Sequence, residues 1–83
     1  MDDEARLKRL RWRCRRGTKE LDALYGWWLE SCWPTADAAT RDAFDQLMDV
    51  QDPELWDWTI GLGQPPRDDW KAIIHAIRAE HQL

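Results

Sequence analysis

The stretch Arg15-Arg16-Gly17-Thr18-Lys19-Glu20 places an arginine, a glycine and a glutamate at fixed offsets where a helix is predicted to begin. An arginine guanidinium can bond a carboxylate or a phosphate through two N–H groups. A glycine has no side chain, so another surface can approach its backbone closely. Glu20, one turn into the helix, can accept hydrogen bonds from the free N–H groups at the helix start. The residues predict a helix cap, a charged docking point, or both.

No familiar catalytic arrangement stands elsewhere in the chain. His75 and His81 are six residues apart in one predicted helix, which is not the i, i+4 spacing of paired metal ligands, and we expect a surface role for both. Asp52 and Glu54 could act as an acid pair, but capping of a helix that begins there explains both. The sequence contains no GxSxG, P-loop or glycine-rich nucleotide motif. We therefore predict that the chain is not an enzyme and binds no metal.

The cysteines and the N-terminal residues bear on the compartment. Cys14 and Cys32 form no CxxC pair, so we expect reduced, buried thiols and neither a redox motif nor a zinc site. The first four residues are Met-Asp-Asp-Glu, and no apolar run approaches the roughly 18 residues that a membrane span needs. We expect a cytoplasmic protein that does not insert into a membrane.

Charge is distributed unevenly along the chain. Residues 1–20 carry eight Lys or Arg and four acids, a net charge of +4, whereas the remaining residues carry a net charge of −8. Such a basic arm can bind nucleic acid, an acidic protein patch or a phosphate-bearing cofactor, or it can pair with the acidic body of the same chain. A solvated helix that needs no partner is the preferred interpretation of the arm.

The 83 residues suffice for one domain, residues 1–83, and their apolar spacing predicts five helices. The first covers about residues 3–14, the second runs from near Gly17 to Pro34, and the third is capped by Thr35 and runs to about Asp49. A short fourth helix begins at Asp52 and is broken by Gly61, Gly63, Pro65 and Pro66, and the fifth covers about residues 67–80. No segment alternates with period two. The predicted fold is a small all-α bundle of five helices with antiparallel neighbours.

Apolar residues are predicted to fill particular faces of these helices. The clearest stripe, in the second helix, comprises Leu21, Leu24, Tyr25, Trp28, Leu29 and Cys32. Leu62 is assigned to the buried face of the fourth helix, together with Leu55 and Trp58. Of the seven tryptophans, Trp27 falls off the stripe and is the candidate for an exposed aromatic side chain. Gly26 interrupts the second helix at a cost of about 1 kcal/mol relative to alanine.

Two blocks of sequence carry a resemblance to a known family. The stretch from Trp12 to Asp22 resembles the RGxxE signature of the bacterial succinate dehydrogenase assembly factors, also called FAD assembly factors. The second block begins at Leu47-Met48 and continues with Asp52-Pro53-Glu54-Leu55, Trp58, Gly63 and Pro65, which is similar to a segment of that family at matching separation from the first block. The resemblance runs from about Leu7 to about Ile77, and this chain departs from the pattern mainly in Trp27, Trp28, Trp33 and Gly26.

The resemblance implies a five-helix assembly factor, or chaperone, that is monomeric when free. It would bind the flavoprotein subunit of succinate dehydrogenase, and of fumarate reductase as a further client, and promote protein flavinylation, the covalent attachment of FAD. FAD would be the cofactor of the client and would not be bound stably by this chain. The implied partner-binding residues are Arg16, Gly17 and Glu20, flanked by Trp12, Arg15 and Lys19. Bulk at Gly17 is then expected to block the client without disturbing the core.

A different class of function rests on the basic arm. A small nucleic-acid-binding protein, or the antitoxin half of a toxin pair, would bind through Arg6, Lys8, Arg9 and Arg11, and its affinity would fall steeply with salt. The acidic body argues against this alternative. A third possible function is that of a purely structural helical adaptor without any effect on flavin content.

Overall fold

The computed structural model describes residues 3–83, which form five α-helices and one short 3-10 helix. The α-helices are α1 (Asp3–Arg13), α2 (Lys19–Ser31), α3 (Ala38–Leu47), α4 (Asp52–Ile60) and α5 (Asp68–His81), and the 3-10 helix is η1 (Trp33–Thr35). No strand occurs in this part of the chain. The prediction of an all-α fold with five helices is confirmed.

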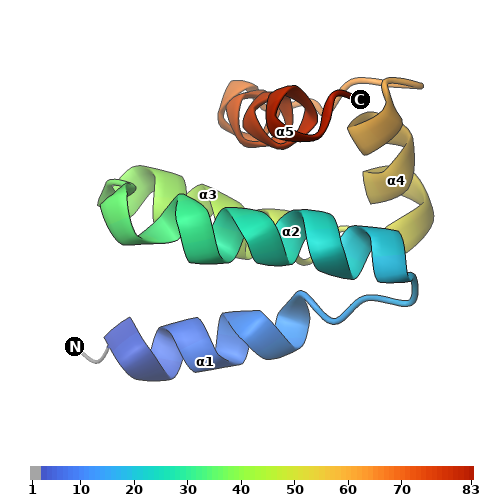
Figure 1. Cartoon of the computed structure of the whole chain (residues 1–83). Helices are drawn as coiled ribbons and strands as arrows, with labels where there is room; N and C mark the ends of the chain where they lie inside the picture. Colours follow the sequence, from blue (N-terminus) through green and yellow to red (C-terminus); the bar gives the residue numbers. More distant parts are fainter. Residues whose placement is uncertain (1–2) are drawn as a thin grey trace.

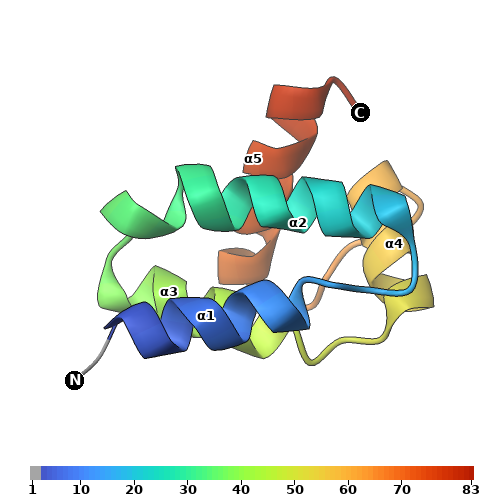
Figure 2. The same ribbon diagram turned by 60° about the horizontal axis from the view of Figure 1, so that its bottom comes forward.

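The first three helices run antiparallel to their neighbours in the chain, and α5 crosses them. Figure 1 shows α1 and α2 side by side, with α3 behind α2 and α4 at the end where the chain turns. Figure 2 shows α5 crossing behind α2, so that α2 is covered by α1 on one side and by α5 on another. Because α5 packs on both α2 and α3, the predicted antiparallel arrangement holds for α1 to α3 and does not extend to α5.

Aromatic side chains from α2, η1 and α3 form the centre of the core. The rings of Trp28 and Phe44 are stacked with centroids 4.4 Å apart, and Trp33 meets Phe44 edge-on at 6.4 Å. The Tyr25 hydroxyl lies 2.8 Å from Thr59 Oγ1, which connects α2 to α4, and burial raises the pKa of Tyr25 to about 12. The described buried apolar residues are Leu10, Cys14, Leu21, Leu24, Tyr25, Trp28, Leu29, Trp33, Ala43, Phe44, Leu47, Met48, Leu55, Trp58, Ile73, Ile74 and Ile77.

Two helix starts differ from the prediction. The helix predicted to begin near Gly17 begins at Lys19, and Thr18 caps it by accepting a 3.2 Å hydrogen bond from the Leu21 amide. The third helix is capped by Asp37, which accepts from the Thr40 amide at 2.8 Å. Thr35 was the predicted cap, but it belongs to η1, because Pro34 starts a separate 3-10 turn before the chain enters α3. In both cases the N-cap residue is of a type preferred at helix starts, Thr or Asp, and it lies one or two residues after the predicted position.

The prediction of which apolar residues are exposed was wrong at two positions. Leu62 is 74% exposed, because Gly61 adopts a left-handed conformation with φ of 88° and ends α4 before Leu62 can join its buried face. Trp27 is half-buried, since the end of α5 covers it and the His81 ring meets it edge-on at 5.2 Å. Trp12, 69% exposed, is the exposed tryptophan instead.

The ionisable residues singled out in the sequence lie mostly where they were expected. His75 is exposed, whereas His81 is half-buried beside Trp27. Both cysteines are free thiols, Cys14 buried and Cys32 half-buried. Within residues 3–83, each helix is too short or too polar to span a bilayer.

Candidate functional site

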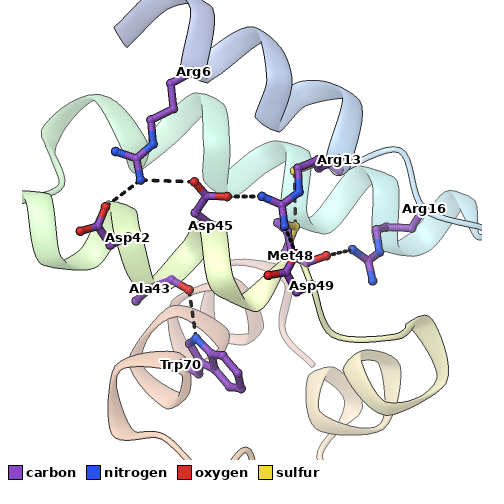
Figure 3. Close-up of polar contacts among 10 residues, drawn as sticks. Arg6, Arg13, Arg16, Asp42, Ala43, Asp45, Met48, Asp49 and Trp70 are labelled. Carbon is purple, nitrogen blue, oxygen red and sulfur yellow. Dashed lines mark hydrogen bonds and ion pairs between the residues drawn. The ribbon is translucent and has the colours of Figure 1, made fainter. Parts of the chain in front are cut away.

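The Arg16 side chain is buried in contacts with its own chain and is 9% exposed. Its Nε donates to Asp52 Oδ1 at 2.6 Å, and its Nη1 donates to the Met48 carbonyl at 2.7 Å, a bond drawn in Figure 3. Its Nη2 donates to the Val50 carbonyl. The expectation that this guanidinium stands ready for an external carboxylate or phosphate is therefore wrong, because the loop between α3 and α4 already occupies it.

Gly17 takes part in the same set of contacts. Its amide donates to Asp52 Oδ2 at 2.7 Å, so Asp52 receives one hydrogen bond on each carboxylate oxygen. A Cβ atom at position 17 would lie 2.9 Å from that Oδ2, which is closer than real Cβ atoms come to their neighbours. Bulk at Gly17 therefore displaces the Asp52 carboxylate, an internal contact that the sequence did not reveal, although it does not reach the core.

We call these contacts the Arg16–Asp52 latch: Arg16, Gly17 and Asp52, with the carbonyl groups of Met48 and Val50. The latch joins the α1–α2 connection to the start of α4. The Gly17 amide and, after it, the Arg16 guanidinium hold the pKa of the Asp52 carboxyl below its usual value. The latch therefore fixes the backbone of the motif in one conformation.

Two acidic residues of the site were missed by sequence reasoning. Asp52 was predicted to cap α4, but Gln51 is the N-cap residue and the Asp52 carboxylate bonds across the chain to Arg16 and Gly17. Asp22 accepts the Arg16 amide N–H, which closes the turn before α2. Asp52 stands next to a proline at a helix start, and that local pattern suits a cap equally well, so the sequence offered no means of separating the two roles.

Glu20 is exposed in the first turn of α2. The predicted capping role belongs to Thr18, which bonds the Leu21 amide. Within residues 3–83, the Glu20 carboxylate makes neither an ion pair nor a hydrogen bond. Its position still suits the positive end of the α2 dipole, and both carboxylate oxygens remain available to a partner.

The residues that flank the motif are exposed as well. The Arg15 guanidinium lies 5.0 Å from the centroid of the Trp12 ring, an arrangement typical of a cation–π interaction. Arg15 and Lys19 form no ion pair with the described residues. We call the exposed set Trp12, Arg15, Gly17, Lys19 and Glu20 the motif surface. Five of the six predicted site residues lie on it, and Arg16 lies beneath it.

Half of the eight basic side chains of the arm pair with the acidic body of the chain, one of the alternatives that the sequence left open, so the preferred interpretation of a solvated helix without a partner holds only for the other half. Arg6 contacts Asp42 at 2.7 Å, and Arg13 pairs with Asp45 and Asp49, so that α1 is bound along α3 (Figure 3). Arg11 pairs with Glu30 of α2 at 2.7 Å. The basic residues of the arm that form no ion pair within the described chain are Lys8, Arg9, Arg15 and Lys19.

The described residues offer little chemistry of their own. No three His, Cys, Asp or Glu side chains of residues 3–83 gather closely enough to hold a metal ion. The Cys14 thiol lies 3.8 Å from the Met48 sulfur, and burial raises its pKa to about 12, so the unreactive protonated form prevails.

Comparison with known proteins identifies the family to which this chain belongs. A family model described as "Flavinator of succinate dehydrogenase" matches residues 8–81. The chain is 40% identical over 79 residues to the FAD assembly factor SdhE of Xylella fastidiosa (strain Temecula1), covering 95% of this chain and 81% of that protein. It is 36% identical over 78 residues to the SdhE of Coxiella burnetii, covering 94% and 95% of the two chains. The chain thus belongs to the family of succinate dehydrogenase flavinators, the FAD assembly factors.

Proposed function

We propose that this chain binds the flavoprotein subunit of succinate dehydrogenase, or of the related fumarate reductase, and promotes covalent attachment of FAD to it. The observation that carries the proposal is that the residues of the motif differ in exposure. The Arg16 guanidinium is bonded to groups of its own chain, whereas the family's glycine and glutamate positions, Gly17 and Glu20, are exposed. A rigid backbone with an unpaired carboxylate suits recognition of a partner better than it suits catalysis.

The motif surface offers contacts of different kinds within a short stretch of chain. Trp12 provides a large exposed ring, a residue type that often dominates binding energy in interfaces. Arg15 and Lys19 supply positive charge beside it, and Glu20 supplies a negative one. The client surface that fits this arrangement is an apolar patch with acidic groups near Trp12 and a basic group near Glu20.

The factor would act by positioning and would make no bond itself. Binding stabilises one conformation of the client, in which a client side chain can attack the flavin, and the factor then dissociates. We propose that FAD is met only within the client. Two hollows of the described surface, each of ≈ 390 Å³, are open grooves that do not enclose a ligand, which supports this view. This mode of action by positioning the client needs neither a cofactor nor a nucleophile from this chain.

Co-expression tests the proposal. The flavoprotein subunit is produced with and without this chain, and its covalent flavin is measured by fluorescence in denaturing gels. We expect strong fluorescence in the presence of the chain and little in its absence. Equal flavinylation in both cultures would overturn the proposal, and would leave a purely structural adaptor as the better interpretation.

A further inference from the structure

A groove of ≈ 390 Å³ runs between α1 and α2, beside the motif surface. Ala23, Gly26 and Leu29 of α2 line one side of it, and Arg11 of α1 and Arg15 of the α1–α2 connection line the other. Figures 1 and 2 both show these two helices lying side by side. The groove is therefore built on two rigid elements, and Arg15 belongs both to it and to the motif surface.

Gly26 holds the groove open, and the fold itself does not require a glycine there. A glycine within a helix costs about 1 kcal/mol relative to alanine. A Cβ atom at Gly26 would meet nothing within 4 Å, so no neighbouring atom excludes a side chain. Gly61 is the glycine with a positive φ in residues 3–83, so Gly26 does not serve an unusual backbone conformation. The missing side chain benefits something that approaches from outside.

The edge of the groove next to the motif surface carries a cation without an ion-pair partner, Arg15. Glu30 is engaged by Arg11, whose Nε lies 2.7 Å from Glu30 Oε1. Asp22 is engaged by the Arg16 amide. The Arg15 guanidinium lies over the Trp12 ring and has no carboxylate partner within the described residues. Asp22 has no ion-pair partner among the described residues and keeps its negative charge, so the groove as a whole is not basic. It combines small, largely apolar side chains of α2 with one cation at its edge, Arg15, that has no carboxylate partner.

We propose that the groove receives an apolar side chain of the flavoprotein subunit, next to a carboxylate of the same segment that pairs with Arg15. This inference rests on the proposed function and extends it, because it makes the α1–α2 groove a second contact region beside the motif surface. Gly26 sets the specificity: it leaves room for the client side chain where a larger residue would fill the space.

The test fills the groove without emptying the core. Isothermal titration measures the affinity of the purified apo-flavoprotein subunit for the wild type and for Gly26→Ala, Gly26→Gln and Arg15→Gln, with Ala72→Gln on the exposed face of α5 as the matched control. We expect Gly26→Gln to bind about tenfold or more weakly, and Gly26→Ala and Ala72→Gln to bind within about twofold of the wild type. Arg15→Gln should weaken binding and reduce its salt dependence.

The outcomes separate this inference from the proposed function. If the wild type binds and Gly26→Gln binds equally well while remaining folded by circular dichroism, the groove is not a client site, although the proposed function stands. If the wild type itself does not bind, the proposed function fails. Analytical ultracentrifugation completes the test: a wild-type dimer that Gly26→Gln abolishes would identify a second copy of the chain as the occupant and overturn the inference.

Discussion

Arg16 and Asp52, 36 residues apart in the chain, form an ion pair in which Arg16 Nε lies 2.6 Å from Asp52 Oδ1. The other oxygen of the same carboxylate accepts the Gly17 amide at 2.7 Å. The two sequence blocks that carry the family resemblance therefore meet in space. The first block presents the motif surface, and the second block holds the first in place.

Replacing Asp52 by asparagine is expected to lower the free energy of unfolding by about 1–3 kcal/mol. The Arg16 side chain is 9% exposed and would lose its counter-charge, although Asp52 is itself 31% exposed and water can partly replace it. Urea denaturation measures the change. Asp57→Asn, an exposed residue of the same helix, is the control and should change stability little. Equal stability of the two variants would show that the latch contributes nothing.

Gly17→Ala is expected to destabilise the chain through Asp52. The added Cβ would lie 2.9 Å from Asp52 Oδ2, so the carboxylate must shift and its bonds to Gly17 and Arg16 must lengthen. A double-mutant cycle of Gly17→Ala and Asp52→Ala, followed by urea denaturation, should give a coupling energy of about 0.5–3 kcal/mol. Additive effects of the two substitutions would mean that Gly17→Ala destabilises the chain through contacts other than the one with Asp52.

The latch also makes a prediction about pH. The pKa of the Asp52 carboxyl is lowered in the folded protein, so Asp52 contributes stability that is complete above the unfolded pKa of about 3.9 and is lost as the pH falls through the folded value. The difference in unfolding free energy between the wild type and Asp52→Asn should therefore be larger near pH 7 than near pH 3. A difference that stays constant across this range would contradict the role of the ionised carboxylate.

Gly26→Ala is expected to raise the free energy of unfolding by about 0.5–1 kcal/mol, because alanine is the better helix former and the added Cβ meets no neighbour. Thermal unfolding followed by circular dichroism measures the gain. A loss of stability would mean that the groove beside Gly26 closes in solution.

The helices were predictable because their signals are local. The apolar stripe of α2 packs as its spacing indicates, and Gly61 ends α4 as a glycine should. Whether Trp12 or Trp27 is exposed depends on where the end of α5 comes to lie, which the periodicity of a single helix does not reveal.

The site was predictable in its residues and not in their partners. Five of the six residues expected to bind a partner are exposed, but Arg16 is enclosed by groups that lie more than 30 residues away in the chain. Asp52 has the sequence context of a helix cap, and its actual role depends on tertiary contact alone.

We propose that the outward-facing part of the motif acts on the flavoprotein subunit. Glu20→Lys tests it most directly, because Glu20 has no partner within the described residues and its replacement leaves the latch intact. Glu54→Lys is the matched control: Glu54 is also an exposed glutamate in the first turn of a helix, so the two variants change charge and helix dipole alike.

The measurement is the covalent flavin fluorescence of the flavoprotein subunit co-expressed with each variant. We expect Glu54→Lys to support flavinylation like the wild type, and Glu20→Lys to weaken client binding by about tenfold or more and to reduce the signal clearly. Equal flavinylation with the two variants, both folded, would contradict the account.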